Sequence, residues 1–369
     1  MKKTFQESLL QFIGAMVIGW LIMYLVPAKM FFTLYIPSSF FWLFWLVALG
    51  VIGRGWPVAP PEGVWKPGMS KLVPGISMTL LWLGLALLNT LAVTNIWPAV
   101  PLFPVTNYFG ILLFMTSLWY ALNWGAYPVA KKSGVTNLIT GAVVILVITS
   151  ILWLLLVNLK DTPWAGMPFD PIGLFQADFM LGLAVWVIVW VQVFGNALSM
   201  QSYPFYKLGE PAGQIVLTIV AVLLGYVSWV GTLQFMSPTF SFAAIGGSII
   251  GWTLFHSVIF GYYPNAKYIQ PKRGVYNLIV VAILVIIWIP LLRLILTPIL
   301  VNVTAAGLPF DISVISVFYT LHVVAVLLLA HNFFWLKIPF APPGPPIGPE
   351  EVPPGFESMT QIQETIDAK

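Results

Sequence analysis

Cysteine is absent from the 369 residues, and charged residues make up only 8% of them. The lack of cysteine excludes disulfides, thiolate metal sites and cysteine-ligated iron–sulfur clusters within the chain. An ordinary soluble domain carries about 25% charged residues, so this composition cannot supply the surface of a water-soluble fold. With 59% apolar residues and a mean hydropathy of +0.93, the chain is expected to be an all-α polytopic membrane protein.

The sequence also lacks the local motifs of enzymes. It contains no HExxH, no P-loop, no GxSxG and no GxGxxG followed by an acid. Its three histidines do not form a bis-histidine haem pattern, and its net charge of +4 is scattered over short loops rather than gathered for nucleic acid. We therefore expect no catalytic residue, no metal, no resident cofactor and no nucleic-acid partner, and a function other than that of an enzyme.

Long apolar runs separated by short polar breaks predict ten transmembrane helices. They are expected at 8–27, 38–53, 73–95, 106–124, 137–158, 171–196, 213–233, 241–260, 276–300 and 312–336. Ten spans put both termini on one side, and thirteen Lys and Arg residues then lie inside while Lys29 and Lys160 lie outside. The positive-inside rule thus predicts cytoplasmic termini in a cell (inner) membrane.

The last segment, 340–369, is rich in proline and acids and follows a single transmembrane domain over 1–339. It is expected to be a cytoplasmic tail, because its proline density excludes helix. Two interpretations stay open: an extension that covers the inner face, or a strap that docks a cytoplasmic or membrane partner.

Five helix ends share one pattern, in which a residue that is aromatic in four cases precedes a proline. The five stretches are GRGWPVAP, NWGAYPVA, MQSYPFYK, FGYYPNAK and WLKIPFAP, with their prolines at 57, 128, 204, 264 and 339. Proline stops a helix, and Trp or Tyr suits the membrane interface. Five recurrences predict five helical hairpins.

A longer repeat joins two pairs of these hairpins. SGVTNLI (133–139) matches RGVYNLI (273–279), and AGMPFD (165–170) matches AGLPFD (306–311). The offset spans an even number of helices, so copies at about 106–204 and 241–339 are a parallel duplication. Asp170 and Asp311 are expected to cap helices that start at the outer face; alternatively, the two acids guide a cation there.

Ionisable residues within lipid are costly, so Asp178, His322 and Arg293 are the candidate solute or proton-path residues. If the sixth helix starts at 171, Asp178 lies about 12 Å deep, and His322 lies about 16 Å beyond Asp311. The repeat offset carries Asp178 to Tyr319, close to His322, so the two groups either share a central site or bond separately through Gln176, Tyr319 or Thr320. Arg293 either snorkels to the outer interface or lines a vestibule for an anionic or carbonyl-bearing ligand.

The leading hypothesis is a transporter or channel for a small solute. The plan of five hairpins is similar in architecture to that of the tellurite-resistance and plant slow-anion-channel family. The alternatives are a haem-free, quinol-interacting membrane subunit of a redox complex, for which quinone is the implied cofactor, or a structural anchor subunit. The lipid bilayer is the one expected partner in every case, and the sequence is compatible with an oligomer.

Overall fold

The computed structural model describes residues 2–66, 68–70, 72–96, 105–130, 132–160, 162, 164–166 and 170–339. The chain is mostly helical (74%) with almost no sheet. Over the described ranges, nine helices are long and apolar enough to cross a membrane. The segment 340–369, expected to form a tail, lies outside the described residues.

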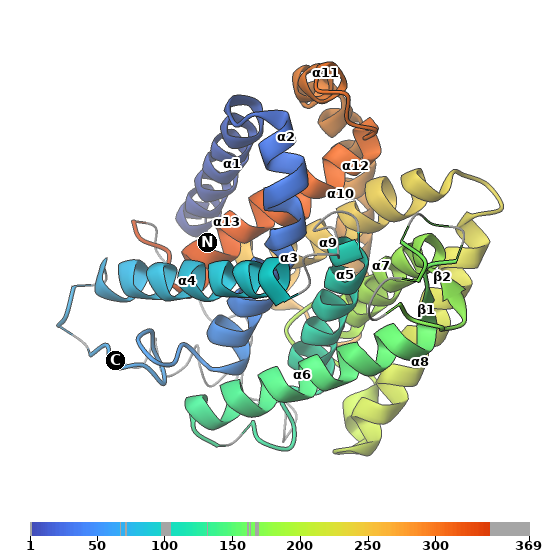
Figure 1. Cartoon of the computed structure of the whole chain (residues 1–369). Helices are drawn as coiled ribbons and strands as arrows, with labels where there is room; N and C mark the ends of the chain where they lie inside the picture. The colour runs from blue at the N-terminus through green and yellow to red at the C-terminus, as the bar shows by residue number, and fades with distance from the viewer. Residues whose placement is uncertain are drawn as a thin grey trace.

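The helices fall into an outer set and an inner set (Figure 1). The outer set is α1 (Lys2–Leu25), α4 (Leu72–Ile96), α6 (Gly134–Leu156), α8 (Ala212–Thr232) and α10 (Lys272–Ile295). The inner set is α2 (Ala28–Met30) with η1 (Phe31–Tyr35), α3 (Ile36–Val47) and η2 (Ala48–Ile52); α5 (Val105–Leu118) with η3 (Trp119–Asn123); α7 (Ala177–Phe194); η5 (Phe240–Gly246) with α9 (Gly247–Leu254) and η6 (Phe255–Ile259); and α12 (Ile312–Val317) with η8 (Phe318–Val324) and α13 (Ala325–Phe333). The remaining elements are β1 (Val157–Asn158), β2 (Phe175–Gln176), η4 (Phe205–Leu208), η7 (Asn265–Lys267) and α11 (Thr297–Ala305).

The inner helices close into a ring. Along it, α3 contacts α5, α5 contacts α7, α7 contacts α9 and η5, η5 contacts α12, and η8 and α13 return to α3. Each later outer helix packs on the inner helix that precedes it in the chain: α4 on α3, α6 on α5, α8 on α7 and α10 on α9. Helix α1 packs on η8 and α13, the last inner elements, so the first segment completes the outer layer.

Burial separates the two layers clearly. In the spans Ala28–Ile52, Ala177–Phe194, Phe240–Ile259 and Ile312–Phe333, 72% to 83% of the hydrophobic window is buried, against 22% to 33% in the outer spans. In Figure 1, α4 and α6 cross the direction of α3 and α5, the inner helices that they cover. The exposed apolar faces of the outer helices are therefore the surface that meets lipid tails.

Several predicted helix boundaries are wrong. The second span begins at Ala28 rather than 38, and the ninth breaks at Leu296, after which α11 begins. The span predicted at 106–124 coincides with α5 and η3, of 14 and 5 residues, which are not among the nine long apolar helices.

The sixth helix shows the largest difference, because it begins at Ala177 and not at 171. Residues 171–176 instead lie along the end of α6, where β2 pairs in parallel with β1. Gly173 makes this approach feasible, since a Cβ there would lie 2.4 Å from the backbone of Leu156. The second copy has Val314 at the equivalent position and is helical there. Gly173 thus leaves room for the contact with α6 that residues 171–176 make in place of a helical turn.

The five proline turns, defined here as the segments around Pro57, Pro128, Pro204, Pro264 and Pro339, share one backbone geometry. In each turn, two successive residues have positive φ, between 49° and 77°, and the following X–Pro peptide is cis. In each, the N–H of the residue before proline donates to the carbonyl three residues earlier, at 2.8 to 3.1 Å. The recurring pattern in the sequence therefore corresponds to one repeated structural turn.

The repeated GVxNLI motif starts an outer helix against a proline turn. At Gly134, a Cβ would lie 2.6 Å from the carbonyl oxygen of Gly53, and at Gly274 it would lie 2.3 Å from the sulfur of Met200. Gly53 and Met200 occupy the same place, four residues before the proline, in the first and third turns. Gly134 therefore leaves room for a backbone atom and Gly274 for the end of a methionine side chain, each beside a proline turn.

Tryptophan indoles link neighbouring helices. The Nε1 atoms of Trp119 and Trp124 donate to Thr218 at 2.8 and 3.1 Å. Trp186 donates to Ser241 at 3.0 Å, and Trp335 donates to Thr79 at 3.1 Å. These bonds satisfy polar atoms inside an apolar bundle, where an unpaired donor is costly.

Candidate functional site

His322 is buried inside the helical ring, with 5% of its surface exposed, and it contacts the first inner helix rather than Asp178. Its Nδ1 lies 2.6 Å from Oγ of Ser39 in α3. Tyr35 donates to the backbone carbonyl of His322 at 2.5 Å. The rings of Phe40 and Phe318 pack edge-on against the imidazole, at 4.8 and 5.4 Å between centroids. The orientation of the imidazole is therefore fixed by residues of α3 and of η8.

The hydrogen bonds of Ser39 determine which nitrogen of His322 carries the proton. The Ser39 hydroxyl donates its one hydrogen to the carbonyl of Ile36 at 2.5 Å. With this hydrogen on Ile36, the Ser39 oxygen accepts from His322, an arrangement that puts the proton on Nδ1 and leaves Nε2 with a lone pair. Among the described residues, Nε2 forms no hydrogen bond. It is thus a buried acceptor that has no partner among the described residues.

Asp178 lies at the very start of its helix rather than deep within it. It is the second residue of α7, is exposed, and accepts a 2.6 Å hydrogen bond from the Tyr108 hydroxyl of α5. The depth of about 12 Å predicted for it was wrong, because residues 171–176 are not helical. No described hydrogen bond joins Asp178 to His322, and each has a partner of its own.

The two acids of the repeated turn differ in role. Asp311 caps α12, accepting from the N–H of Val314 at 2.9 Å, as predicted. Asp170 does not cap a helix; it accepts from the N–H of Gly166 at 2.5 Å and closes its own turn. The prediction of a helix cap is therefore right for Asp311 and wrong for Asp170.

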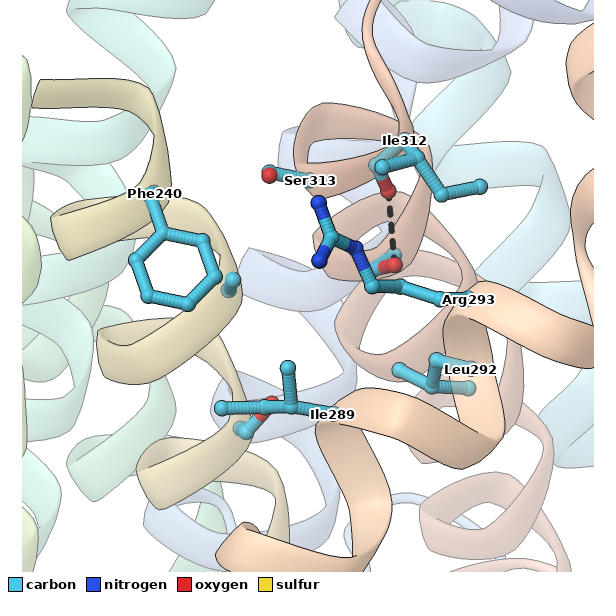
Figure 2. A pocket seen from close by; sticks show the side chains of 9 residues that line it. Phe240, Ile289, Leu292, Arg293, Ile312 and Ser313 are labelled. Atoms are coloured by element: carbon cyan, nitrogen blue, oxygen red, sulfur yellow. Dashed lines mark hydrogen bonds between the residues drawn. The ribbon is translucent and has the colours of Figure 1, made fainter. Parts of the chain in front are cut away.

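Arg293 is exposed in the last turn of α10 and lines a small pocket between α10, η5 and α12. Figure 2 shows its guanidinium extending toward Ser313 and the ring of Phe240. Over the described part of the chain, this side chain has no ion pair or hydrogen bond.

The pocket beside Arg293 has a volume of about 10 Å³. Such a space holds about one water molecule. A larger solute can contact the guanidinium only if α10 and η5 separate, or if it approaches from the exposed side of Arg293.

The remaining two candidate residues, Tyr319 and Gln176, do not contact Asp178 or His322 through a described hydrogen bond. Tyr319 is fully buried and donates to the backbone carbonyl of Met16 in α1 at 2.7 Å. Gln176 is exposed in β2, immediately before α7, and its side chain does not cap the helix. Neither residue joins Asp178 to His322.

Two histidines that the sequence left unassigned hold proline turns. His256 and His331 each lie eight residues before their turn proline. Nε2 of His256 donates to the carbonyl of Tyr263 at 3.0 Å, and Nε2 of His331 to that of Ile338 at 2.5 Å. Their equal spacing from the proline was a signal that could have identified this role.

Arg273 is a further buried residue that sequence reasoning placed among the loop charges. It is 1% exposed and donates to Oε1 of Gln201 at 2.6 Å, while its guanidinium lies 5.9 Å from the ring of Tyr262. It thereby ties the start of α10 to the third and fourth proline turns.

Across the residues that the structure covers, no group of three or more His, Cys, Asp or Glu side chains is arranged to hold a metal. The closed ring and its lipid-facing outer layer define the class, a multi-pass α-helical membrane protein. Comparison with protein-family models, with curated proteins and with solved structures finds no match for the chain.

Proposed function

We propose that the chain is an integral membrane transporter or channel for a small solute, which crosses through the ring of inner helices. The observation that carries this proposal is the closed ring itself, in which buried His322 and Ser39 place polar atoms among apolar helices. Polar groups in this setting are costly unless they serve a path or a contact. The free lone pair of His322 Nε2 gives a passing solute a hydrogen-bond acceptor.

Arg293 favours an anionic or carbonyl-bearing solute at the entrance. A guanidinium offers five donors, and none of those on Arg293 has a described acceptor. Asp178 and Asp170 lie at the same end of the bundle as the start of α7, so this end also carries acids. The shared central site of Asp178 and His322 is not part of this proposal.

The topology completes the proposal. Ten spans arranged as five hairpins, with a parallel duplication, would account for the five identical proline turns and for the equivalent contacts of Gly134 and Gly274. The protein would then lie in the inner membrane of the cell. The distribution of Lys and Arg favours a cytoplasmic position for both termini.

The test is flux through proteoliposomes that contain only this protein. Chloride, nitrate and formate represent small anions, and urea and glycerol represent neutral solutes. We expect solute entry above that of empty liposomes, and Arg293→Gln should lower anion entry several-fold while Arg293→Lys retains most of it. No flux of any of these solutes, with folded protein in the vesicles, would contradict the proposal for them.

The second candidate is a haem-free quinol-interacting subunit. An Asp–His pair would have supported it, but Asp178 and His322 have separate hydrogen-bond partners. The third, an anchor subunit, depends on residues 340–369. Co-purification of an iron–sulfur protein would favour the second, and loss of a partner on removing 340–369 would favour the third.

A further inference from the structure

An apolar groove lies between α1, α4 and α13, on the outside of the helical ring. It has a volume of about 390 Å³. Sites for small organic ligands typically measure about 300–1,000 Å³. Leu10 and Ile18 at its rim are 60% and 53% exposed, so the groove opens on the surface that meets lipid.

Among the described residues, the wall of the groove is mainly apolar and aromatic and includes no Lys, Arg, Asp or Glu; His331 is its one titratable side chain. Trp82 and Trp335 supply indole surface, and Ala15 and Leu328 supply aliphatic surface. Because no Lys or Arg lines it, the groove offers nothing to neutralise a phosphate, which argues against a phospholipid headgroup as its occupant.

Uncharged hydrogen-bond donors lie in the same groove. Oγ1 of Thr79 accepts from Trp335, and its own hydroxyl hydrogen has no acceptor among the described residues. Gln11 lies 2.7 Å from Nδ1 of His331 through its Nε2. The amide nitrogen of Gln11 carries two hydrogens and contacts His331 with one of them, so one N–H of this amide is left over.

We infer that this groove binds an isoprenoid quinone, with its planar ring between the two indoles and its carbonyls toward Thr79 and Gln11. Neutral donors suit carbonyl acceptors, aromatic walls suit a planar ring, and the exposed apolar rim suits a long hydrocarbon tail. The inference does not rest on the transport proposal, and its site is separate from Asp178, His322 and Arg293.

Gly14 allows the groove to be filled without disturbing the protein. It lines the groove, and a Cβ built there meets no atom within 4 Å. Gly84 in α4 is equally open but does not line the groove. Gly14→Leu should therefore block the groove, and Gly84→Leu is the matched control for adding a leucine to an outer helix.

The experiment is equilibrium binding of decylubiquinone to the purified full chain in mild detergent, with decylbenzene as the probe that has the tail but lacks carbonyls. We expect saturable binding of decylubiquinone, a loss of at least about tenfold in affinity in Gly14→Leu, and no change in Gly84→Leu. Thr79→Val removes one donor and should weaken binding about 2- to 12-fold, the range of one hydrogen bond. Gly14→Ala is the milder variant if the leucine impairs folding.

Three results would overturn the inference. They are no saturable binding to the wild type, equal binding to Gly14→Leu and wild type, or equal competition by decylbenzene, which would make the groove a cleft for lipid tails. Because binding is measured without flux, a failure here is distinct from a failure of the transport assay.

Discussion

The protonation of His322 is the most specific prediction of the structure. Wild-type His322 should carry its proton on Nδ1, because Ser39 has given its own hydrogen to Ile36. His256 and His331 should carry theirs on Nε2, because a backbone carbonyl can only accept. Three histidines in the chain should therefore show two different tautomers.

Replacing Ser39 by alanine removes the acceptor for that proton. A buried N–H without a partner costs about 1–3 kcal/mol, which would shift the tautomer ratio of His322 about 5- to 160-fold toward Nε2–H. The ring can relieve the penalty by moving its proton, so the loss in unfolding free energy should stay below about 3 kcal/mol. Nε2 would then be a donor, and a solute that needs an acceptor there should cross more slowly.

The assay is nuclear magnetic resonance of protein labelled with ¹³C,¹⁵N-histidine, in which each protonated nitrogen is identified by its bonded carbon. Ser38→Ala is the matched control, since Ser38 donates to the carbonyl of Tyr35 at 2.8 Å and does not bond to His322. The reasoning is refuted if all three histidines share one tautomer, or if Ser39→Ala leaves His322 unchanged.

Three further predictions concern stability, measured as thermal unfolding in detergent. Gly225→Ala should destabilise by about 1–3 kcal/mol, because its Cβ would lie 2.9 Å from backbone atoms of α7, whereas Gly231→Ala in the same helix meets open space and should not destabilise; equal effects of the two would contradict this packing. Asp311→Ala should cost about 0.5–2 kcal/mol by removing the cap of α12, and Asp311→Asn should recover most of it; an equal loss in both variants would argue against capping. Burial raises the pKa of Tyr262 from 10.0 to about 12, so the stability that this residue contributes is complete below about pH 10 and is lost between about pH 10 and 12. Tyr262→Phe should therefore lose less stability than the wild type between about pH 10 and 12, and an identical loss would refute this assignment.

The five proline turns show how far the sequence can predict local structure. A proline that follows an aromatic residue in four of the five cases determines a turn through neighbouring atoms, so Pro57 and its four counterparts were recognisable without tertiary information. The cap by Asp311 is equally local and was predicted correctly. The same pattern failed at Asp170, because Gly173 lets the chain pack against α6, a contact that depends on a segment about fifteen residues earlier.

The candidate site was predicted less well than the fold class. His322 and Arg293 could be singled out because charge and polarity are expensive in lipid, whatever the packing. Their partners could not, because the Ser39–His322 bond joins residues 283 positions apart and the Gln11–His331 bond joins residues 320 apart. The repeat offset predicted that Asp178 and His322 lie close together, but their hydrogen bonds go to different helices.

The sequence by itself determined the class of this protein and the places where its chain turns. Hydropathy and charge depend on composition alone, since a segment of some twenty apolar residues needs lipid whatever lies next to it. The tertiary structure alone decided that the inner helices close into a ring, that α1 returns to α13, and that Gln11, Thr79 and Trp82 line one groove. Every outer helix is apolar enough to face lipid, so only the packing of glycines and side chains between helices determines which neighbour each one meets.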